Sequence, residues 1–308
     1  MEILKTVDGE IQRIDEIVAD SWINLCKPTQ KEISKLSEEL NVERDFLTAA
    51  LDEEETSRIE TEDGQTLIII DIPYVNENDG LIIYETLPIA VILLEKNIIT
   101  VCLKENHITK DFADSKIKNV YTNMKTRFLL QVLYRVATKY LLHLRQIDRR
   151  SAAVEKELHK SMKNKELIQL LDLEKSLVFF STSLKANEVT VEKILKGRFV
   201  KLYEDDKDLL EDVLIEIKQA IEMSTIYSNI LSGTMDAFAS IISNNLNIVM
   251  KVLTSITIIM AIPTMISGFF GMNMEPGTMP FHNFWVVFLI SAGISGIAAL
   301  VLYLKKLL

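Results

Sequence analysis

The chain has 308 residues, of which 48% are hydrophobic and 25% are charged, and its formal net charge is −10. The apolar residues are concentrated near the C-terminus, where residues 249–308 hold one acidic residue, Glu275, and three lysines. This distribution excludes a purely soluble protein. The acidic balance of the first 248 residues argues against a nucleic-acid binder, which would carry basic patches.

Residues 1–125 predict a small α/β domain in the cytoplasm, because helical patterns precede three β-branched runs of strand length. The helical patterns cover 30–40 and 42–51, and the strand-length runs cover 66–73, 87–94 and 97–103. Turn-forming residues bound the runs at 76–80 and 95–97. No phosphate-binding glycine-rich loop, dinucleotide fingerprint or nucleophile with its base is present in the sequence, so we expect neither an enzyme nor a cofactor.

The two cysteines, Cys26 and Cys102, match no metal-binding or redox spacing. We expect them to be buried thiols in a reducing compartment. The first ten residues have no basic region and no apolar core, so we expect no signal peptide.

Residues 126–200 predict charged helical arms, whose charges of mixed sign are typical of a solvated or interhelical face. From Tyr203 to Phe269 the sequence has no proline before Pro263. One helix over this run would be about 65 residues and roughly 100 Å long. We expect residues 201–248 to form a cytoplasmic stalk helix with an apolar face that contacts its neighbours.

Two uncharged apolar runs, each about 20 residues long, predict transmembrane helices at 249–270, which we expect to line a pore, and at 284–304. An external loop, 271–283, joins them, and a basic cytoplasmic tail, 305–308, follows.

Basic residues flank these spans on one side only. Lys251 stands at the start of the first span, just before its uncharged run 252–270, Lys305 and Lys306 follow the second span, and the loop contains no Lys or Arg. The positive-inside rule therefore predicts a multi-pass protein of the cytoplasmic (inner) membrane with both termini in the cytoplasm.

A stripe of small and partly hydroxylic residues recurs at helical spacing along the first span. It consists of Asn247, Met250, Thr254, Thr257, Ala261, Thr264, Gly268 and Gly271. In a bilayer such a face is either a helix-packing seam or a pore lining, and periodicity leaves both open. One hairpin cannot enclose a pore, so a pore would require several protomers.

The sequence Phe270-Gly271-Met272-Asn273 stands at the outer end of the first span, before a short loop and one last span. In that position it resembles the signature of the CorA family of divalent-cation channels, which is Gly-Met-Asn. The segment 243–254 and the pair Pro263-Thr264 also resemble that family. The detailed likeness covers residues 236–280, and the order of elements matches over the whole chain.

The resemblance implies a funnel-shaped homopentamer in the bilayer that conducts divalent cations, most of all Mg2+ and also Co2+ and Ni2+, with no nucleic-acid partner. The implied selectivity filter is Gly271, Met272 and Asn273, and the implied outer-mouth residue is Glu275. The implied pore lining is Asn247, Met250, Leu253, Thr257, Ala261, Thr264 and Gly268. Mg2+ holds its waters tightly, so side-chain and backbone carbonyls at the mouth would bind the hydrated ion.

The resemblance also implies regulation by intracellular cation bound to acidic residues between neighbouring protomers. Asp212 and Asp236 match acidic positions of the family. Ala50 stands where the family often has an acid, and the adjacent Asp52 and Glu53 are the expected substitutes. A solvated acidic loop is the alternative at these last two positions.

Two departures leave the transported ion open. Phe270 stands where the family commonly has Tyr, and the loop lacks the Glu that usually follows Met279-Pro280. His282 favours a softer ion such as Zn2+. The alternatives are therefore a zinc transporter of the related zinc branch, proton-coupled transport included, and a non-conducting membrane scaffold or sensor in which Asn273 tolerates substitution.

Overall fold

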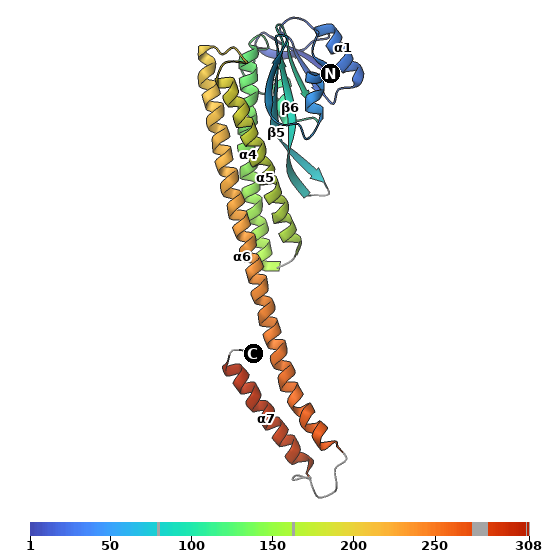
Figure 1. The fold of residues 1–308 in the computed structure, drawn as a ribbon, viewed down its shortest axis with the longest axis vertical. Coiled ribbons are helices and arrows are strands. Elements are labelled where there is room, and N and C mark those ends of the chain that lie inside the picture. The colour runs from blue at the N-terminus through green and yellow to red at the C-terminus, as the bar shows by residue number, and fades with distance from the viewer. Residues whose placement is uncertain (79–80, 162–163, 273–282, 306, 308) are drawn as a thin grey trace. The chain divides into compact units, whose positions relative to one another are not determined.

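The computed structural model describes residues 1–308 apart from 79–80, 162–163, 273–282, 306 and 308 (Figure 1). The chain divides into two compact units, Met1–Gly233 and Thr234–Leu308. One helix, α6 (Glu204–Phe270), begins in the first unit and ends in the second.

The first unit is built on a seven-stranded sheet in the order β2-β1-β3-β7-β6-β5-β4. Its strands are β1 (Glu2–Val7), β2 (Glu10–Arg13), β3 (Trp22–Cys26), β4 (Arg58–Glu62), β5 (Gln65–Asn78), β6 (Leu81–Leu93) and β7 (Ile98–Cys102). All neighbours are antiparallel except β3 and β7, which run parallel in the middle of the sheet. The predicted α/β fold is confirmed: β5 contains the predicted run 66–73, and β6 and β7 match the runs 87–94 and 97–103 to within one residue at each shared end.

Strands β1 to β4 lie outside the predicted runs. Three of them, β1, β2 and β4, are joined to a neighbouring strand by an Asp-Gly turn. Asp8 and Gly9 join β1 to β2 with φ values of 50° and 86°, and Asp63 and Gly64 join β4 to β5 with 46° and 78°. Both residues of each turn are left-handed, as two-residue hairpins require, and Asp-Gly is a favoured pair for that geometry.

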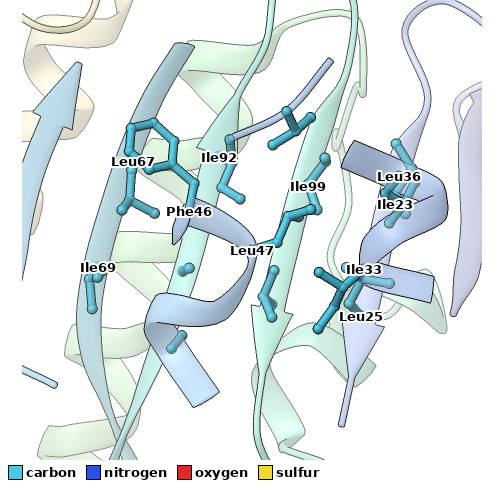
Figure 2. Close-up of a cluster of buried hydrophobic side chains, with 14 of the residues drawn as sticks. Ile23, Leu25, Ile33, Leu36, Phe46, Leu47, Leu67, Ile69, Ile92 and Ile99 are labelled. Atoms are coloured by element: carbon cyan, nitrogen blue, oxygen red, sulfur yellow. The ribbon is translucent and has the colours of Figure 1, made fainter. Parts of the chain in front are cut away.

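One face of the sheet is covered by α1 (Gln30–Leu40), α2 (Arg44–Thr48) and a 3-10 turn (Ala49–Leu51). Thr29 caps α1 in a capping box with Glu32, which fixes where the helix begins. Figure 2 shows the resulting core. Its labelled side chains are Ile33 and Leu36 from α1, Phe46 and Leu47 from α2, and Ile23, Leu25, Leu67, Ile69, Ile92 and Ile99 from the sheet.

The other face packs against α3 (His107–Ala113), α4 (Lys125–Ser161) and α5 (Asn164–Leu195). Because side chains alternate along a strand, Trp22 points away from the core that holds Ile23. Its ring lies 5.1 Å from that of Phe128 on α4 and 6.4 Å from that of Phe112 on α3. The sheet is thus apolar on both faces and buried between two helical layers.

The edge of β5 beyond the end of β4 is closed by side chains instead of a strand. Strand β4 begins at Arg58, opposite Ile69, so the main chain of Asp71 has no strand on that side. Asn187 of α5 accepts from Asp71 N at 2.9 Å and donates to Asp71 O at 2.7 Å. The hydroxyl of Tyr140 on α4 donates to the same carbonyl at 3.0 Å. These bonds tie both long helices to the sheet.

The first part of α6 belongs to this helical layer. Leu210, Val213 and Ile217 are buried at helical spacing. The hydroxyl of Ser224 donates to Leu177 O of α5 at 2.9 Å, and Lys218 pairs with Glu188 of α5 at 3.9 Å. The apolar stripe of this helix therefore faces the helical layer.

The second unit contains the rest of α6 and α7 (Phe284–Leu304), which Asn283 caps through a bond from Trp285 N at 3.2 Å. Both helices are long and apolar enough to cross a membrane. Most of their large apolar side chains are exposed, which in water would be very unfavourable. The structure thus has the two expected membrane-spanning helices.

We predict that Asn187→Ala destabilises the first unit by about 2 kcal/mol, because a buried main-chain N–H of Asp71 loses its partner. Denaturant unfolding of the full chain in detergent, followed by tryptophan fluorescence, measures the effect. The exposed neighbour Lys185→Ala is the control and should stay within about 0.5 kcal/mol of the wild type. Equal midpoints for the two variants would contradict the role given to Asn187.

Candidate functional site

Gly271 and Met272, the described part of the Gly-Met-Asn sequence, directly follow the last residue of helix α6. Gly271 N donates to Ser267 O at 2.9 Å, and a Cβ added to Gly271 would meet that same carbonyl at 3.3 Å. Glycine is therefore the residue that fits this helix end without displacing its neighbour. Met272 follows and is largely exposed. Asn273, Glu275 and His282 lie outside the described residues.

The residues predicted to line a pore share one exposed face of α6. They are Asn247, Met250, Leu253, Thr257, Ala261, Thr264 and Gly268. Along the middle of this face runs a shallow groove of about 660 Å³, lined by Leu253, Ile256, Thr257, Met260, Ala261, Thr264 and Met265. The structure thus brings the predicted lining together as a continuous strip within one chain.

The hydroxyls on this face are oriented by their own helix. Thr257 donates to Leu253 O at 2.8 Å, and Thr264 donates to Met260 O at 3.1 Å. A hydroxyl has one donor and two acceptor lone pairs, so each threonine oxygen can still accept a hydrogen bond. The face therefore presents oxygen acceptors, the groups that interact with a cation or with its waters.

The opposite face of α6 is different. Ser255 stands nine residues before Thr264, or about 180° around the helix. It is 3% exposed, and its hydroxyl donates to Leu307 O at 2.9 Å near the C-terminus. In the second unit, α6 thus makes this contact within the chain through the face that carries Ser255. The face that carries Thr257 and Thr264 remains exposed.

The acidic residues predicted to bind regulatory cations are all exposed. Asp212 lies on the first part of α6 and Asp236 on its second part. Asp52 accepts from Glu54 N at 3.0 Å, which turns its carboxylate toward its own loop. In the described residues no three His, Cys, Asp or Glu side chains are grouped as metal ligands.

Glu53 is held by a partner that the sequence did not indicate. Lys104, just beyond β7, lies 2.8 Å from Glu53, and this hydrogen bond raises the pKa of Lys104. The same ammonium lies over the ring of Tyr74 at 5.5 Å. Ala50, in contrast, is fully buried in the core, whereas Asp52 and Glu53 are exposed.

The fold combines an α/β domain with two helices, α6 and α7, that are long and apolar enough to cross a membrane, and α6 carries exposed threonines on one face. The sequence model of the CorA-like Mg2+ transporter protein family matches residues 20–306. The chain therefore belongs to that family, as the resemblance at Gly271 and Met272 implied.

Two relatives extend the match over the whole length. The cobalt/magnesium transport protein CorA of Methanocaldococcus jannaschii is 27% identical over 300 residues, which cover 91% of this chain and 90% of the relative. The complete structure of the CorA magnesium transporter from the same organism superposes with a TM-score of 0.81 at 23% identity, over 99% and 96% of the two chains. The second comparison shows the shared fold.

The cytoplasmic domain of ZntB from Vibrio parahaemolyticus also has this fold. It aligns with a TM-score of 0.60 at 14% identity, over 80% of this chain and 98% of the other. Family membership makes the chain a membrane transporter of divalent cations and not an enzyme. The cation is thus the transported substrate.

We predict that Gly271→Ala lowers divalent-cation uptake by roughly five- to tenfold, because relieving the contact with Ser267 O displaces the helix end at a cost of about 1 kcal/mol. Uptake into proteoliposomes measures the change. Gly293→Ala is the matched control, since a Cβ at Gly293 meets no atom within 4 Å in the described chain. Equal uptake by both variants would show that the helix end tolerates displacement.

Proposed function

We propose that the protein is a homopentameric Mg2+ channel of the cytoplasmic membrane, with both termini in the cytoplasm. The observation that carries the proposal is the exposed strip of oxygen acceptors on α6, in a chain of the CorA-like family. The cobalt and magnesium transport named for the Methanocaldococcus relative supports Mg2+ as the ion, with Co2+ and Ni2+ as further substrates.

An assembly of several protomers follows from what the strip requires, and its five-fold form is what the resemblance to the CorA family implies. A hydroxyl face directed at lipid leaves acceptors without partners, which is unfavourable in a bilayer. Five copies of α6 around an axis place Thr257, Ala261, Thr264 and Gly268 on a water-filled path. The second helix, α7, has no charged residue and forms the outer, lipid-facing layer.

At the outer mouth, five Asn273 side chains with the carbonyls of Gly271 act as the filter. Mg2+ releases its waters reluctantly, so carbonyl oxygens that accept from those waters bind the hydrated ion without stripping it. Met272 completes the filter sequence, and Glu275 raises the local cation concentration outside it.

At the inner end, Met250 and Leu253 form the gate. Their side chains are 52% and 56% exposed on the strip, one turn apart. A ring of ten such side chains dewets when it narrows, and an ion cannot cross a dry constriction. Asn247 lies just inside this ring and gives the ion a polar site on the cytoplasmic side.

Intracellular Mg2+ closes the channel by bridging neighbouring protomers. The first unit is rich in exposed carboxylates, and five copies repel one another without cations. Asp212, Asp236, Asp52 and Glu53 are exposed in the single chain, so a neighbour's carboxylates can complete a site with them. Bound cations relieve the repulsion and stabilise the closed pentamer.

We predict that Asn273→Ala abolishes Mg2+ uptake into proteoliposomes while the oligomer keeps its mass. Asn283→Ser is the matched control: it removes an amide from the same loop but keeps an oxygen that caps α7. Its uptake should remain within about twofold of the wild type, since a retained cap costs well under 1 kcal/mol. Normal uptake by Asn273→Ala would exclude the filter assignment.

The zinc branch is the second candidate, favoured by His282, by the missing loop Glu and by the fold shared with the ZntB domain. The same assay separates the two when Mg2+, Zn2+, Co2+ and Ni2+ are compared with and without a pH gradient. Uptake of Zn2+ that needs the gradient would replace the magnesium proposal. A well-assembled oligomer that carries none of these ions would support a scaffold or sensor.

We predict that Asp212→Asn keeps Mg2+ uptake active at internal Mg2+ concentrations that close the wild type. The amide is isosteric but uncharged, so it binds the cation weakly and relieves less repulsion. Uptake measured against rising internal Mg2+ should show a midpoint shifted upward by about tenfold, which is 1.4 kcal/mol of coupling. An unchanged midpoint would remove Asp212 from the regulatory site.

A further inference from the structure

The parallel strands β3 and β7 bring together the only two cysteines of the sequence. Their register pairs Cys26 with Cys102, and both are free thiols. Neighbouring strands lie about 4.8 Å apart. A disulfide needs a Cα–Cα distance of roughly 4.4–6.8 Å, so the backbone spacing suits one.

The preceding pair on the same face shows how closely side chains approach in this register. Asn24 and Thr100 are register partners two residues earlier, and Thr100 Oγ1 donates to Asn24 Oδ1 at 2.9 Å. Cys26 and Cys102 are register partners in the same way, two residues further along the strands. Lys27 N donates to Cys102 O at 2.8 Å, so the strands stay together beyond the cysteines.

The two thiols differ in access. Cys102 is buried and lies 3.6 Å from Leu25 O. Cys26 is partly exposed and lines a cavity of about 510 Å³ with Lys27, Leu103, Lys104 and Glu105. A small molecule in this cavity can therefore reach Cys26 first.

A buried amide lies beside the inner thiol. Asn106 is 8% exposed, and its Oδ1 caps α3 by accepting from the main-chain N–H groups of Ile108 and Thr109, both at 3.0 Å. Its Nδ2 is a buried donor without a formed hydrogen bond in the described part of the chain. Burial raises the pKa of the Cys102 thiol well above its ordinary value, and the Asn106 amide opposes this rise to a smaller extent, as a donor to a thiolate would.

We propose that Cys26 and Cys102 are an oxidative modification site, at which a hydroperoxide converts the two thiols into a reversible intramolecular disulfide. The site is separate from the proposed ion pathway and does not depend on it.

The chemistry balances in two steps. The Cys26 sulfur attacks a peroxide oxygen, the O–O bond breaks, and Cys26 becomes a sulfenic acid while one water leaves with the thiol proton. The Cys102 sulfur then attacks the Cys26 sulfur, the S–O bond breaks, and a second water leaves with the Cys102 proton. Two electrons pass from the thiols to hydrogen peroxide. Burial raises the pKa of both thiols, so the reaction is slow at neutral pH.

The test uses the reduced full-length chain in detergent, incubated for hours with hydrogen peroxide. We expect loss of both free thiols, a mass lower by about 2 Da for the two hydrogens removed, and reversal by dithiothreitol. Peptide mapping should link the peptides of Cys26 and Cys102. Thiols that stay free, oxidation that stops at Cys26, or disulfides between two chains would each overturn the proposal.

Two variants test the assigned roles. Cys26→Ser should leave Cys102 as a free thiol under the same treatment, because Cys102 is buried. Asn106→Asp keeps an oxygen that caps α3 but replaces the amide donor with an acceptor. The Cys26 sulfenic acid, trapped with dimedone, should then persist about tenfold longer. An unchanged lifetime would overturn the role of the Asn106 amide.

Discussion

Helix α6 passes through two environments without a break, and the remaining elements follow from what each environment requires of its side chains. Up to Gly233 it is an amphipathic helix, whose apolar stripe is buried among the helices that cover the sheet. Beyond that residue most of its large apolar side chains are exposed, which suits lipid and not water. In the membrane the polar groups become the exceptions, so their positions carry the functional information.

Long periodic segments could be predicted from the sequence because their signals are local. The two helical arms, α6 and the strands β5 and β6 extend over many residues, and the short β7 is part of a continuous β-branched run. Strands β1 to β4 have four to six residues each, too few for periodicity to distinguish them. The Asp-Gly turns were the signal that identifies three of them, since the left-handed conformation at both positions restricts the choice of residues.

Contacts between distant segments could not be predicted from one sequence. Cys26 and Cys102 match no motif, because motifs record spacing along a chain whereas these residues meet through the register of parallel strands. The same holds for the pairing of Lys104 with Glu53 and for the Asn187 side chain that closes the edge of β5. Each arises from the order of the strands in the sheet, which a single sequence does not reveal.

The periodicity of the polar stripe of α6 fits either a helix-packing seam or a pore lining. The hydrogen bonds show that the two faces of the helix make different contacts. Ser255 is buried and bonded to Leu307, so the helix makes its intramolecular contact on that side. Thr257 and Thr264 donate only to their own helix and remain exposed. Because exposed acceptors in hydrocarbon need water or a polar partner, this face is the one on which we base the proposal of several copies around an aqueous path.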